Sequence, residues 1–440
     1  MEARIAEAAG LDVREVTRRL QPLRRDLVSD GIDDAFAILQ EYAPFRLHTF
    51  ESGSPVWTWR IPEKWQCEEA YVETLDGRRV IDAAVNPLHV ASYSAPVDKV
   101  VSRAELEEHL FTHPRIDDEP AFIFYYYDRN WAFSCGRDLR EALTEDAYRV
   151  VVRSRFEKGR MKVAEQRLPG ETDEWIVLDA HICHPLQVND GLIGVMTGLA
   201  VMNALARRPK RRFGYIQLVT PENIGATAWL SRNEDMIPRI KGGICTEMTG
   251  LPQAPALQLS YRGDTEVDRV FRHVHLQAEP DAWAIPYRGL IGNDERQFNA
   301  PGVRIPMLSY ARALPWGHPD RPFRQYHSAR DDLDLVDWDA FDRSVETILE
   351  MLDALEANVF PVNRFKGEPF LSGYDLALDR NKHLLAFRER LRILDCIDGS
   401  LSIVDIAERL EADFWTVKAF VDALAEVGLV EIATEPRPAR

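Results

Sequence analysis

Long hydrophobic runs, internal repeats and a surplus of basic residues are all missing from this 440-residue sequence. No apolar segment approaches the roughly 18–20 residues that cross a membrane, so we expect no membrane-spanning helix. The 54 Lys and Arg residues against 71 Asp and Glu residues give a formal net charge of -17. This acid excess argues against a nucleic-acid partner, because binding to the phosphate backbone needs clustered Lys and Arg.

Cysteine is also scarce. The five cysteines are an odd number, and they are widely scattered: Cys67, Cys135, Cys183, Cys245 and Cys396. This distribution fits reduced thiols better than a disulfide framework. The first residues are charged throughout and lack the apolar core of a signal peptide. We therefore expect a cytoplasmic protein.

The composition is that of a globular protein, and the length predicts two to four domains at roughly 100–200 residues each. Residues 1–44 have the periodicity of amphipathic helices, and residues 45–118 have the short alternating segments of a small β-rich domain. Residues 119–360 alternate between strand and helix patterns. After a segment with Pro and Gly, residues 374–440 read as three helices and a strand, an arrangement similar to a winged helix.

The alternating region carries the signal for the fold class. The segments WIVLDA (175–180), GYIQLV (214–219) and GGICTEM (242–248) have strand patterns, and helical patterns follow, as at 192–207. Apolar strands alternating with helices predict an α/β fold with a doubly wound, mostly parallel sheet.

Polar residues follow these strands where each one ends. In sheets of this kind the carboxyl ends of the strands form the functional site. His181, His184 and Asp190 follow the first strand, Glu222 the second and Glu247 the third, while His327 lies farther along the chain. Two imidazoles and two carboxylates suit a zinc ion with one position left open for water. Glu222 is then the candidate general base.

Each of these residues also has an ordinary structural interpretation. A single His in a loop more often makes hydrogen bonds than binds a metal. Glu247 alone is compatible with a helix cap or a solvated charge. Glu222 alone is compatible with a cap on the following helix, favoured by the helix dipole. The cluster therefore argues for a metal site more strongly than any one of its members.

Four segments, AHICHPLQVNDG, PENIGA, CTEM and YHSARDDLDLV, together resemble the zinc aminopeptidase fold of the M28 class. They resemble more closely the DUF4910 family, whose members carry a small inserted domain (DUF2172) and a C-terminal winged helix. The resemblance implies that 45–118 is the insert and that 1–44 and 119–360 form the metallopeptidase-like catalytic domain. It also implies a role for each site residue: His181 as first metal-binding His, Asp190 as bridging carboxylate, Glu222 as general base, Glu247 as third carboxylate and His327 as distal His.

The sequence departs from the M28 pattern at two positions. Two-metal members of that class carry a second glutamate after the general base, and here that position is Asn223, whose neutral amide is a poor zinc ligand. Cys183 stands where an Asp commonly orients the first His. His184 is an additional residue, a candidate ligand or substrate contact. We therefore expect one tight zinc site, with a second site weak or absent.

The substrate site is expected at the segment GNDERQF. A carboxylate of Asp294 or Glu295 is a candidate partner for a free α-amino group, and Arg296 or Arg312 for a carboxylate. A solvated charge run explains these residues equally well.

The leading functional prediction is a metal-dependent hydrolase of peptide or amide bonds, an exopeptidase similar to aminopeptidases. The alternatives are a single-metal, amide-handling biosynthetic enzyme of the cyclase or amidase kind, and a non-catalytic binding protein.

The C-terminal domain has the wrong charge for DNA binding. Its candidate recognition helix, 414–428, offers Lys418 against Asp422 and Glu426. A DNA-binding protein needs Arg or Lys on its recognition helix to contact phosphates and base edges. We expect this domain to contact protein or to cover the catalytic domain. It and the inserted domain are the candidate surfaces for homo-oligomer formation.

Overall fold

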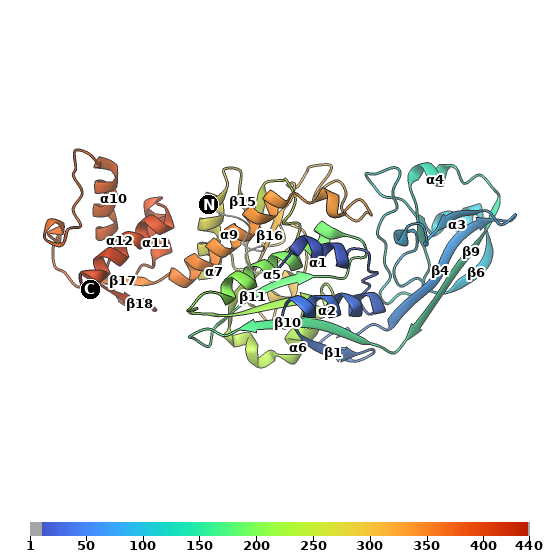
Figure 1. Cartoon of the computed structure of the whole chain (residues 1–440), viewed down its shortest axis with the longest axis horizontal. Helices are drawn as coiled ribbons and strands as arrows, with labels where there is room; N and C mark the ends of the chain where they lie inside the picture. The colour runs from blue at the N-terminus through green and yellow to red at the C-terminus, as the bar shows by residue number, and fades with distance from the viewer. Residues whose placement is uncertain (1–10, 439–440) are drawn as a thin grey trace. The chain divides into compact units, whose positions relative to one another are not determined.

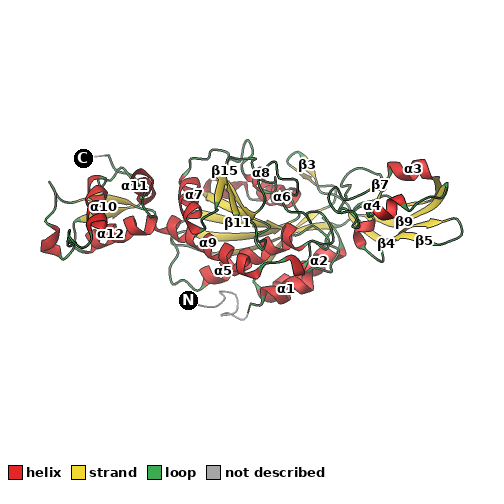
Figure 2. Ribbon diagram, turned by 90° about the horizontal axis from the view of Figure 1, so that it is seen from above, coloured by secondary structure: helices red, strands yellow, loops and turns green. Residues whose placement is uncertain are grey.

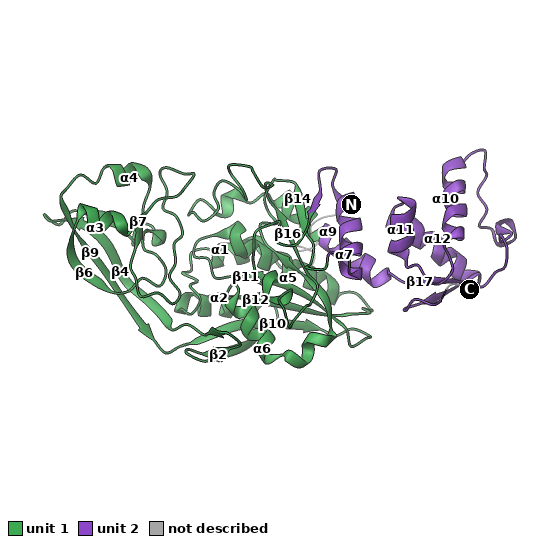
Figure 3. Cartoon of the chain, turned by 180° about the vertical axis from the view of Figure 1, so that it is seen from behind, with its two compact units in different colours: residues 1–262, 285–345 green, residues 263–284, 346–440 purple. Residues whose placement is uncertain are grey.

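The computed structural model describes residues 11–438. The chain divides into two compact units, which are coloured separately in Figure 3. The first contains residues 1–262 and 285–345, and the second contains residues 263–284 and 346–440.

A mixed eight-stranded sheet forms the centre of the first unit (Figure 1). Its strands follow one another in the order β1 (Arg46–Glu51), β10 (Arg160–Leu168), β12 (Gly214–Thr220), β11 (Trp175–His181), β13 (Ile240–Thr246), β16 (Met307–Arg312), β14 (Pro255–Gln258) and β15 (Trp283–Ile285). The central strands β12, β11, β13 and β16 are parallel. Antiparallel strands β1, β10 and β14 flank them. The predicted α/β class is thus confirmed, with a parallel centre and antiparallel margins.

Helices cover both faces of this sheet, which is why its central strands are apolar on both sides. Figure 2 shows α5 (Ile193–Ala206), α1 (Val13–Leu20) and α2 (Asp30–Tyr42) on one face and α6 (Ile224–Arg232) and α8 (Glu295–Phe298) on the other. Residues 188–206 are apolar and long enough to cross a membrane, but 89% of their most apolar stretch is buried inside the protein. This segment is the core helix of the unit.

Small residues let α5 approach the sheet closely. A Cβ added at Gly194 would lie 2.0 Å from the carbonyl oxygen of Thr246, and one at Gly198 would lie 2.4 Å from Nε2 of Gln217. The helix therefore rests directly on the middle of β12 and the end of β13. Two of the predicted site residues, Glu222 and Glu247, follow these strands.

A separate four-stranded sheet has the order β5 (Arg79–Asp82), β4 (Lys64–Thr74), β9 (Ala147–Glu157) and β6 (Val97–Ser102). Its core includes Val72, Phe133 and Val150. Around it lie β2 (Pro55–Val56), β3 (Trp59–Arg60), α3 (Arg103–Glu108), β7 (Leu110–Phe111), β8 (Phe133–Ser134) and α4 (Arg137–Glu141). The boundaries expected at 45 and 118 do not match the sheets, because β1 joins the large sheet and β9 returns to the small one.

The second unit contains α7 (Glu266–Ala278), the larger part of α9 (Trp338–Ala357), and the C-terminal elements. These are β17 (Phe360–Asn363), α10 (Leu384–Asp395), α11 (Ile403–Leu410), α12 (Phe414–Glu426) and β18 (Val430–Ala433), and β17 pairs with β18. Ser402 and Asp405 form a capping box that starts α11. The three helices and strand expected of a winged helix are therefore present.

Candidate metal centre

The predicted ligands meet where the parallel strands end, in the place that doubly wound sheets use for binding. His181 is the last residue of β11, and Glu247 directly follows β13. Asp190 lies in the turn that leads into α5. His181, Asp190 and Glu247 are all less than 4% exposed. Segments far apart in the sequence thus bring imidazole and carboxylate groups together inside the protein.

The first group of ligands is His181, Asp190 and Glu247, which we call the buried set. The Nε2 atom of His181 lies 3.3 Å from Oδ1 of Asp190 and 3.7 Å from Oε2 of Glu247. One ligand atom from each residue lies within 4.8 Å of the other two, a spacing that a single metal ion can span. One imidazole and two carboxylates form a donor set that zinc accepts.

The second group is His184, Asp190 and His327, which we call the cavity set. The Oδ2 atom of Asp190 lies 3.2 Å from Nε2 of His327 and 4.0 Å from Nε2 of His184. Asp190 therefore directs one oxygen toward each group. The ring of Tyr326 stacks on His327 with centroids 3.9 Å apart, and Phe122 contacts both His184 and His327.

Buried polar atoms that make no hydrogen bond indicate that the buried set and the cavity set both suit a cation. Oδ2 of Asp190, Oε1 of Glu247 and Nε2 of His327 are buried and make no hydrogen bond within the described residues. A buried carboxylate or imidazole atom without a partner costs free energy, and a bound cation removes that cost. The sets therefore contain both the donor types and the free donor atoms that a metal ion needs.

The protonation of the histidines follows from their surroundings. Burial holds the pKa of His184 well below its usual value, so its imidazole is neutral and has a lone pair available for a metal. Burial also lowers the pKa of His181, but contacts with Asp190, Cys183 and Glu247 outweigh it and raise the pKa well above its usual value. That proton is the one a cation would displace.

Gly191 is required for the close approach of Asp190 to His181. Its φ is +114°, a left-handed backbone conformation that favours glycine. A Cβ at this position would lie 2.9 Å from both Cε1 and the carbonyl oxygen of His181. The Asn-Asp-Gly sequence thus provides the carboxylate and the tight turn that directs it.

A buried cation outside the predicted motifs holds the ligand loop. Arg25 is fully buried, and its guanidinium donates to the carbonyl oxygens of Ile182 (2.9 Å), His184 and Gln187 (3.0 Å). Burial lowers the pKa of Arg25 to about 9. No local pattern in the sequence indicates this role, because Arg25 lies 157 residues before Ile182.

Asp331 is a second supporting residue that the sequence analysis did not single out. It is fully buried, and its Oδ1 and Oδ2 accept hydrogen bonds from the backbone amides of Asn189 (2.9 Å) and Asp190 (2.8 Å). The Nδ2 of Asn293 likewise donates to Oε2 of Glu247 at 2.9 Å. Such contacts orient metal ligands. The signal for Asp331 was its place in the segment HSARDD, four residues after His327.

Glu222 lies just beyond the end of β12, beside the cavity set. Its Oε2 lies 3.7 Å from Nε2 of His184, and its Oε1 accepts a hydrogen bond from Nδ2 of Asn223 at 2.9 Å. Burial raises the pKa of Glu222 to about 8. A carboxyl group with a pKa in this range can both take and return a proton near neutral pH.

Asn223 does not direct its amide oxygen toward the ligand groups. That oxygen accepts hydrogen bonds from Nη2 of Arg296 (3.1 Å) and Nε2 of Gln297 (3.3 Å). Its backbone φ is +62°, and its N–H donates to Asp294. Asn223 therefore supports Glu222, and the nitrogen donor near Asp190 comes instead from His184, whose Nε2 lies 4.0 Å from Oδ2 of Asp190.

A cavity of about 290 Å³ opens onto this cluster. Its walls are largely aromatic, and its lining residues are Leu27, Trp59, Phe124, Tyr126, Tyr127, His184, Glu222, Asn223, Ile224, Arg296, Tyr326 and His327. Such a volume, with aromatic walls and a few polar groups, is typical of a small-molecule site.

The three residues expected to bind substrate do not all line the cavity. Arg296 lines the cavity, but Asp294 and Glu295 do not. Asp294 is fully buried and accepts a hydrogen bond from Thr220, while Glu295 is fully buried and accepts one from the backbone of Asn293. The fourth candidate, Arg312, is buried against Ser344 and the carbonyl oxygen of Gln253. Asp294 and Glu295 thus support the site from within the protein.

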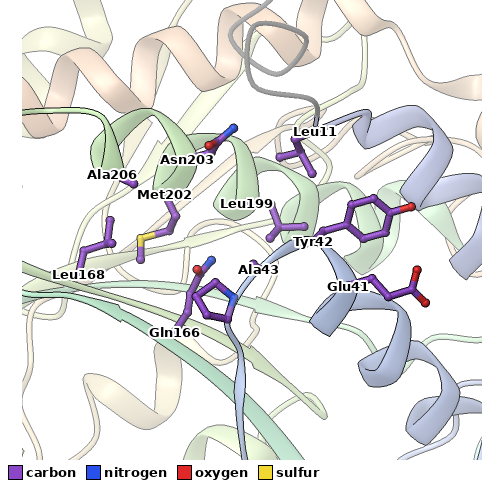
Figure 4. A pocket seen from close by; sticks show the side chains of 11 residues that line it. Leu11, Glu41, Tyr42, Ala43, Gln166, Leu168, Leu199, Met202, Asn203 and Ala206 are labelled. Atoms are coloured by element: carbon purple, nitrogen blue, oxygen red, sulfur yellow. The ribbon is translucent and has the colours of Figure 1, made fainter.

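Another hollow, of about 300 Å³, lies where the end of α2 approaches β10 and α5 (Figure 4). None of the predicted site residues lines it. Its acidic residue Glu41 already pairs with Arg19 at 2.7 Å. This hollow has no feature that indicates chemistry.

The fold of this chain is similar to that of solved zinc aminopeptidases of the M28 class. The chain is similar to a zinc aminopeptidase from Bacillus subtilis, with a TM-score of 0.60 and 11% identity over 80% of this chain and 95% of that one. It is also similar to an M28 peptidase precursor from Shewanella amazonensis, with a TM-score of 0.57 and 14% identity over 83% and 97%. At these identities the likeness shows the shared fold, which is that of M28 aminopeptidases.

The chain belongs to the family described as a domain of unknown function, DUF4910, whose model matches residues 14–358. A winged helix-turn-helix model matches residues 362–432. A protein of Clostridium acetobutylicum is 31% identical over 427 residues, or 96% of each chain; its name, given provisionally, is polysaccharide biosynthesis protein with aminopeptidase-like domain. A crystal structure from the same organism, named provisionally as a peptidase, has a TM-score of 0.86 and 31% identity over 98% of this chain and 97% of that one.

Proposed function

We propose that the protein is a zinc-dependent hydrolase of peptide or amide bonds, an exopeptidase similar to aminopeptidases. The observation that carries this proposal is that Glu222 lines a small cavity with its Oε2 3.7 Å from Nε2 of His184, beside two groups of metal ligands that share Asp190. The reduced thiols, all five of which are free, fit action in the cytoplasm.

The buried set, His181, Asp190 and Glu247, would hold the tightly bound zinc ion, because it offers two carboxylates and is shielded from solvent. The cavity set would hold a second ion only weakly. It has a single carboxylate, shared with the buried set, and the side chain of His327 is 27% exposed. A bound zinc ion supplies Lewis acidity, which polarises the substrate carbonyl and lowers the pKa of water.

Glu222 would move the proton. As water adds to the acyl carbon, the carboxylate of Glu222 takes one of its protons, and it gives that proton to the leaving nitrogen as the carbon–nitrogen bond breaks. The products are then a carboxylic acid and an amine. Asn223 holds Oε1 of Glu222 at 2.9 Å, so Oε2, on the side of His184, is the atom placed for proton transfer.

A biosynthetic, amide-handling reaction on the same scaffold is the second candidate. The name of the 31% identical relative refers to polysaccharide biosynthesis, and the 290 Å³ cavity has room for a small molecule. Such an enzyme would share the zinc ion and Glu222 but would not hydrolyse simple aminoacyl amides.

The test is hydrolysis of a panel of aminoacyl amides and anilides, with and without a chelator. We expect turnover that the chelator abolishes and added zinc restores. The variant Glu222→Gln should keep its fold and its zinc but lose turnover by roughly 10²–10⁴-fold. Near-normal turnover in Glu222→Gln, or turnover that survives the chelator, would contradict the proposal; metal binding without hydrolysis would favour the biosynthetic candidate.

A further inference from the structure

Few charged groups line the cavity above the metal ligands. Apart from the histidines, its charged lining residues are Glu222 and Arg296. Asp294 and Glu295, the nearby carboxylates in the sequence, are fully buried and accept hydrogen bonds from other residues. The cavity thus offers no second carboxylate for a free ammonium group. It offers a guanidinium for an anion.

Arg296 is held in place by two of its nitrogen atoms. Nε donates to the carbonyl oxygen of Asn293 at 3.0 Å, and Nη2 donates to Oδ1 of Asn223 at 3.1 Å. Its side chain is nevertheless 37% exposed at the cavity. A guanidinium fixed on one side and open on the other can bind a carboxylate without losing further side-chain freedom.

The distance between Arg296 and Glu222 indicates which part of the substrate would carry the carboxylate that Arg296 binds. Nη2 of Arg296 lies 3.7 Å from Oε1 of Glu222, the group that would return the proton to the leaving nitrogen. In an α-amino acid only one carbon separates the nitrogen from the carboxylate. A leaving amino acid therefore places its nitrogen at Glu222 and its carboxylate at Arg296 at the same time.

We propose that Arg296 binds an α-carboxylate on the leaving amine, so that the substrates are N-acyl amino acids or dipeptides. This inference rests on the proposed hydrolytic function. The acyl group would occupy the rest of the cavity, which Trp59, Phe124 and Tyr127 line with aromatic side chains. Longer peptides are excluded as good substrates, because in them an amide replaces the carboxylate next to the leaving nitrogen.

The experiment compares N-acetyl amino acids and dipeptides, each with its own C-terminal amide, using the full chain loaded with zinc. We expect kcat/KM to be roughly 10–100-fold higher for the acids, the range for a hydrogen-bonded charge pair. Arg296→Gln should reduce this preference to about onefold with unchanged zinc content, and Arg296→Lys should restore part of it. The control Arg324→Gln removes an exposed arginine that does not line the cavity, and it should keep the full preference. Equal rates for acids and amides in the unmodified protein would overturn the inference while leaving the hydrolase intact.

A binding measurement separates this inference from the proposed function. Zinc-loaded Glu222→Gln is titrated with the amino acids of the panel and with their amides, and heat is recorded. Tighter binding of the acids, lost in Glu222→Gln/Arg296→Gln, supports the inference even if no substrate is hydrolysed. Equal binding of acids and amides overturns it, whatever the rates show.

Discussion

Asn223 donates a hydrogen bond from Nδ2 to Oε1 of Glu222 at 2.9 Å. Its amide oxygen is engaged by Arg296 and Gln297, so both ends of the amide are used. The residue that replaces a metal-binding glutamate is thus an orienting group for the predicted base. Under the proposed function, this relationship would allow Glu222 to act as the base without a carboxylate at position 223.

The variant Asn223→Ala should therefore lower kcat while leaving tightly bound zinc in place. We expect a loss of roughly 10–100-fold, the range seen when a group that orients a site residue is removed. Steady-state kinetics and zinc analysis on the same preparation measure both quantities. Loss of the tight zinc ion in this variant would show that Asn223 is itself a ligand, contrary to its observed contacts.

Gly191→Ala should weaken the metal site through its backbone. The added Cβ would meet His181 at 2.9 Å, and alanine is strained at a φ of +114°. We expect a loss of roughly 2 kcal/mol or more in the free energy of unfolding, together with weaker zinc binding. Denaturant unfolding and competition with a chromophoric chelator measure these effects.

Gly317→Ala is the matched control for that substitution. Gly317 also has a positive φ, +89°, but a Cβ there would meet nothing within 4 Å. Its cost should be confined to backbone strain, about 1 kcal/mol, with zinc affinity unchanged. Equal zinc affinities in the Gly191 and Gly317 variants would refute the role given to the contact with His181.

Glu165 should make stability depend on pH in the acid range. Burial works against ionisation of this carboxyl, but His48, whose Nε2 lies 3.2 Å away, and hydrogen bonds from Arg167 and Trp229 lower its pKa to about 2. Because the folded pKa lies below the unfolded value of about 4.3, the stabilisation is complete above that value. It is lost as the pH falls toward 2.

The test compares the unmodified protein with Glu165→Gln from pH 7 to pH 2.5. We expect the variant to be less stable by about 3 kcal/mol at pH 6, with the difference shrinking below pH 4.5. Glu171→Gln, at a side chain that is 61% exposed, serves as control and should show no such trend. A difference that stays constant down to pH 2.5 would mean that packing, and not ionisation, is responsible.

The sequence predicted the central strands and the ligand loops because their signals are local. β11 and β12 are buried on both faces and so read as continuous apolar runs, and each predicted loop begins where such a run ends. The winged helix was predictable for the same reason, since α11 and α12 have their own N-terminal caps and buried apolar residues.

Features that depend on distant partners were not predictable from one sequence. Arg25 finds the carbonyl oxygens of the ligand loop 157 to 162 residues away, and β9 pairs with β4 across an intervening segment. For Asp294 and Glu295 a substrate contact and a solvated charge run fitted the sequence equally well. Their burial depends on hydrogen bonds from the distant residues Thr220 and Gln258, which composition alone does not predict. Only the folded chain shows that Arg296 alone of this run faces the cavity.

The most direct test of the metal centre is the number and affinity of zinc ions bound by the purified chain and by three single variants. We predict one tightly bound ion per chain. It should be lost in His181→Ala and in Glu247→Ala, whose residues belong to the buried set, and retained in His184→Ala, which should lose only a weak second ion. A chain that binds no zinc, or one that holds two ions with equal tightness, would contradict this arrangement.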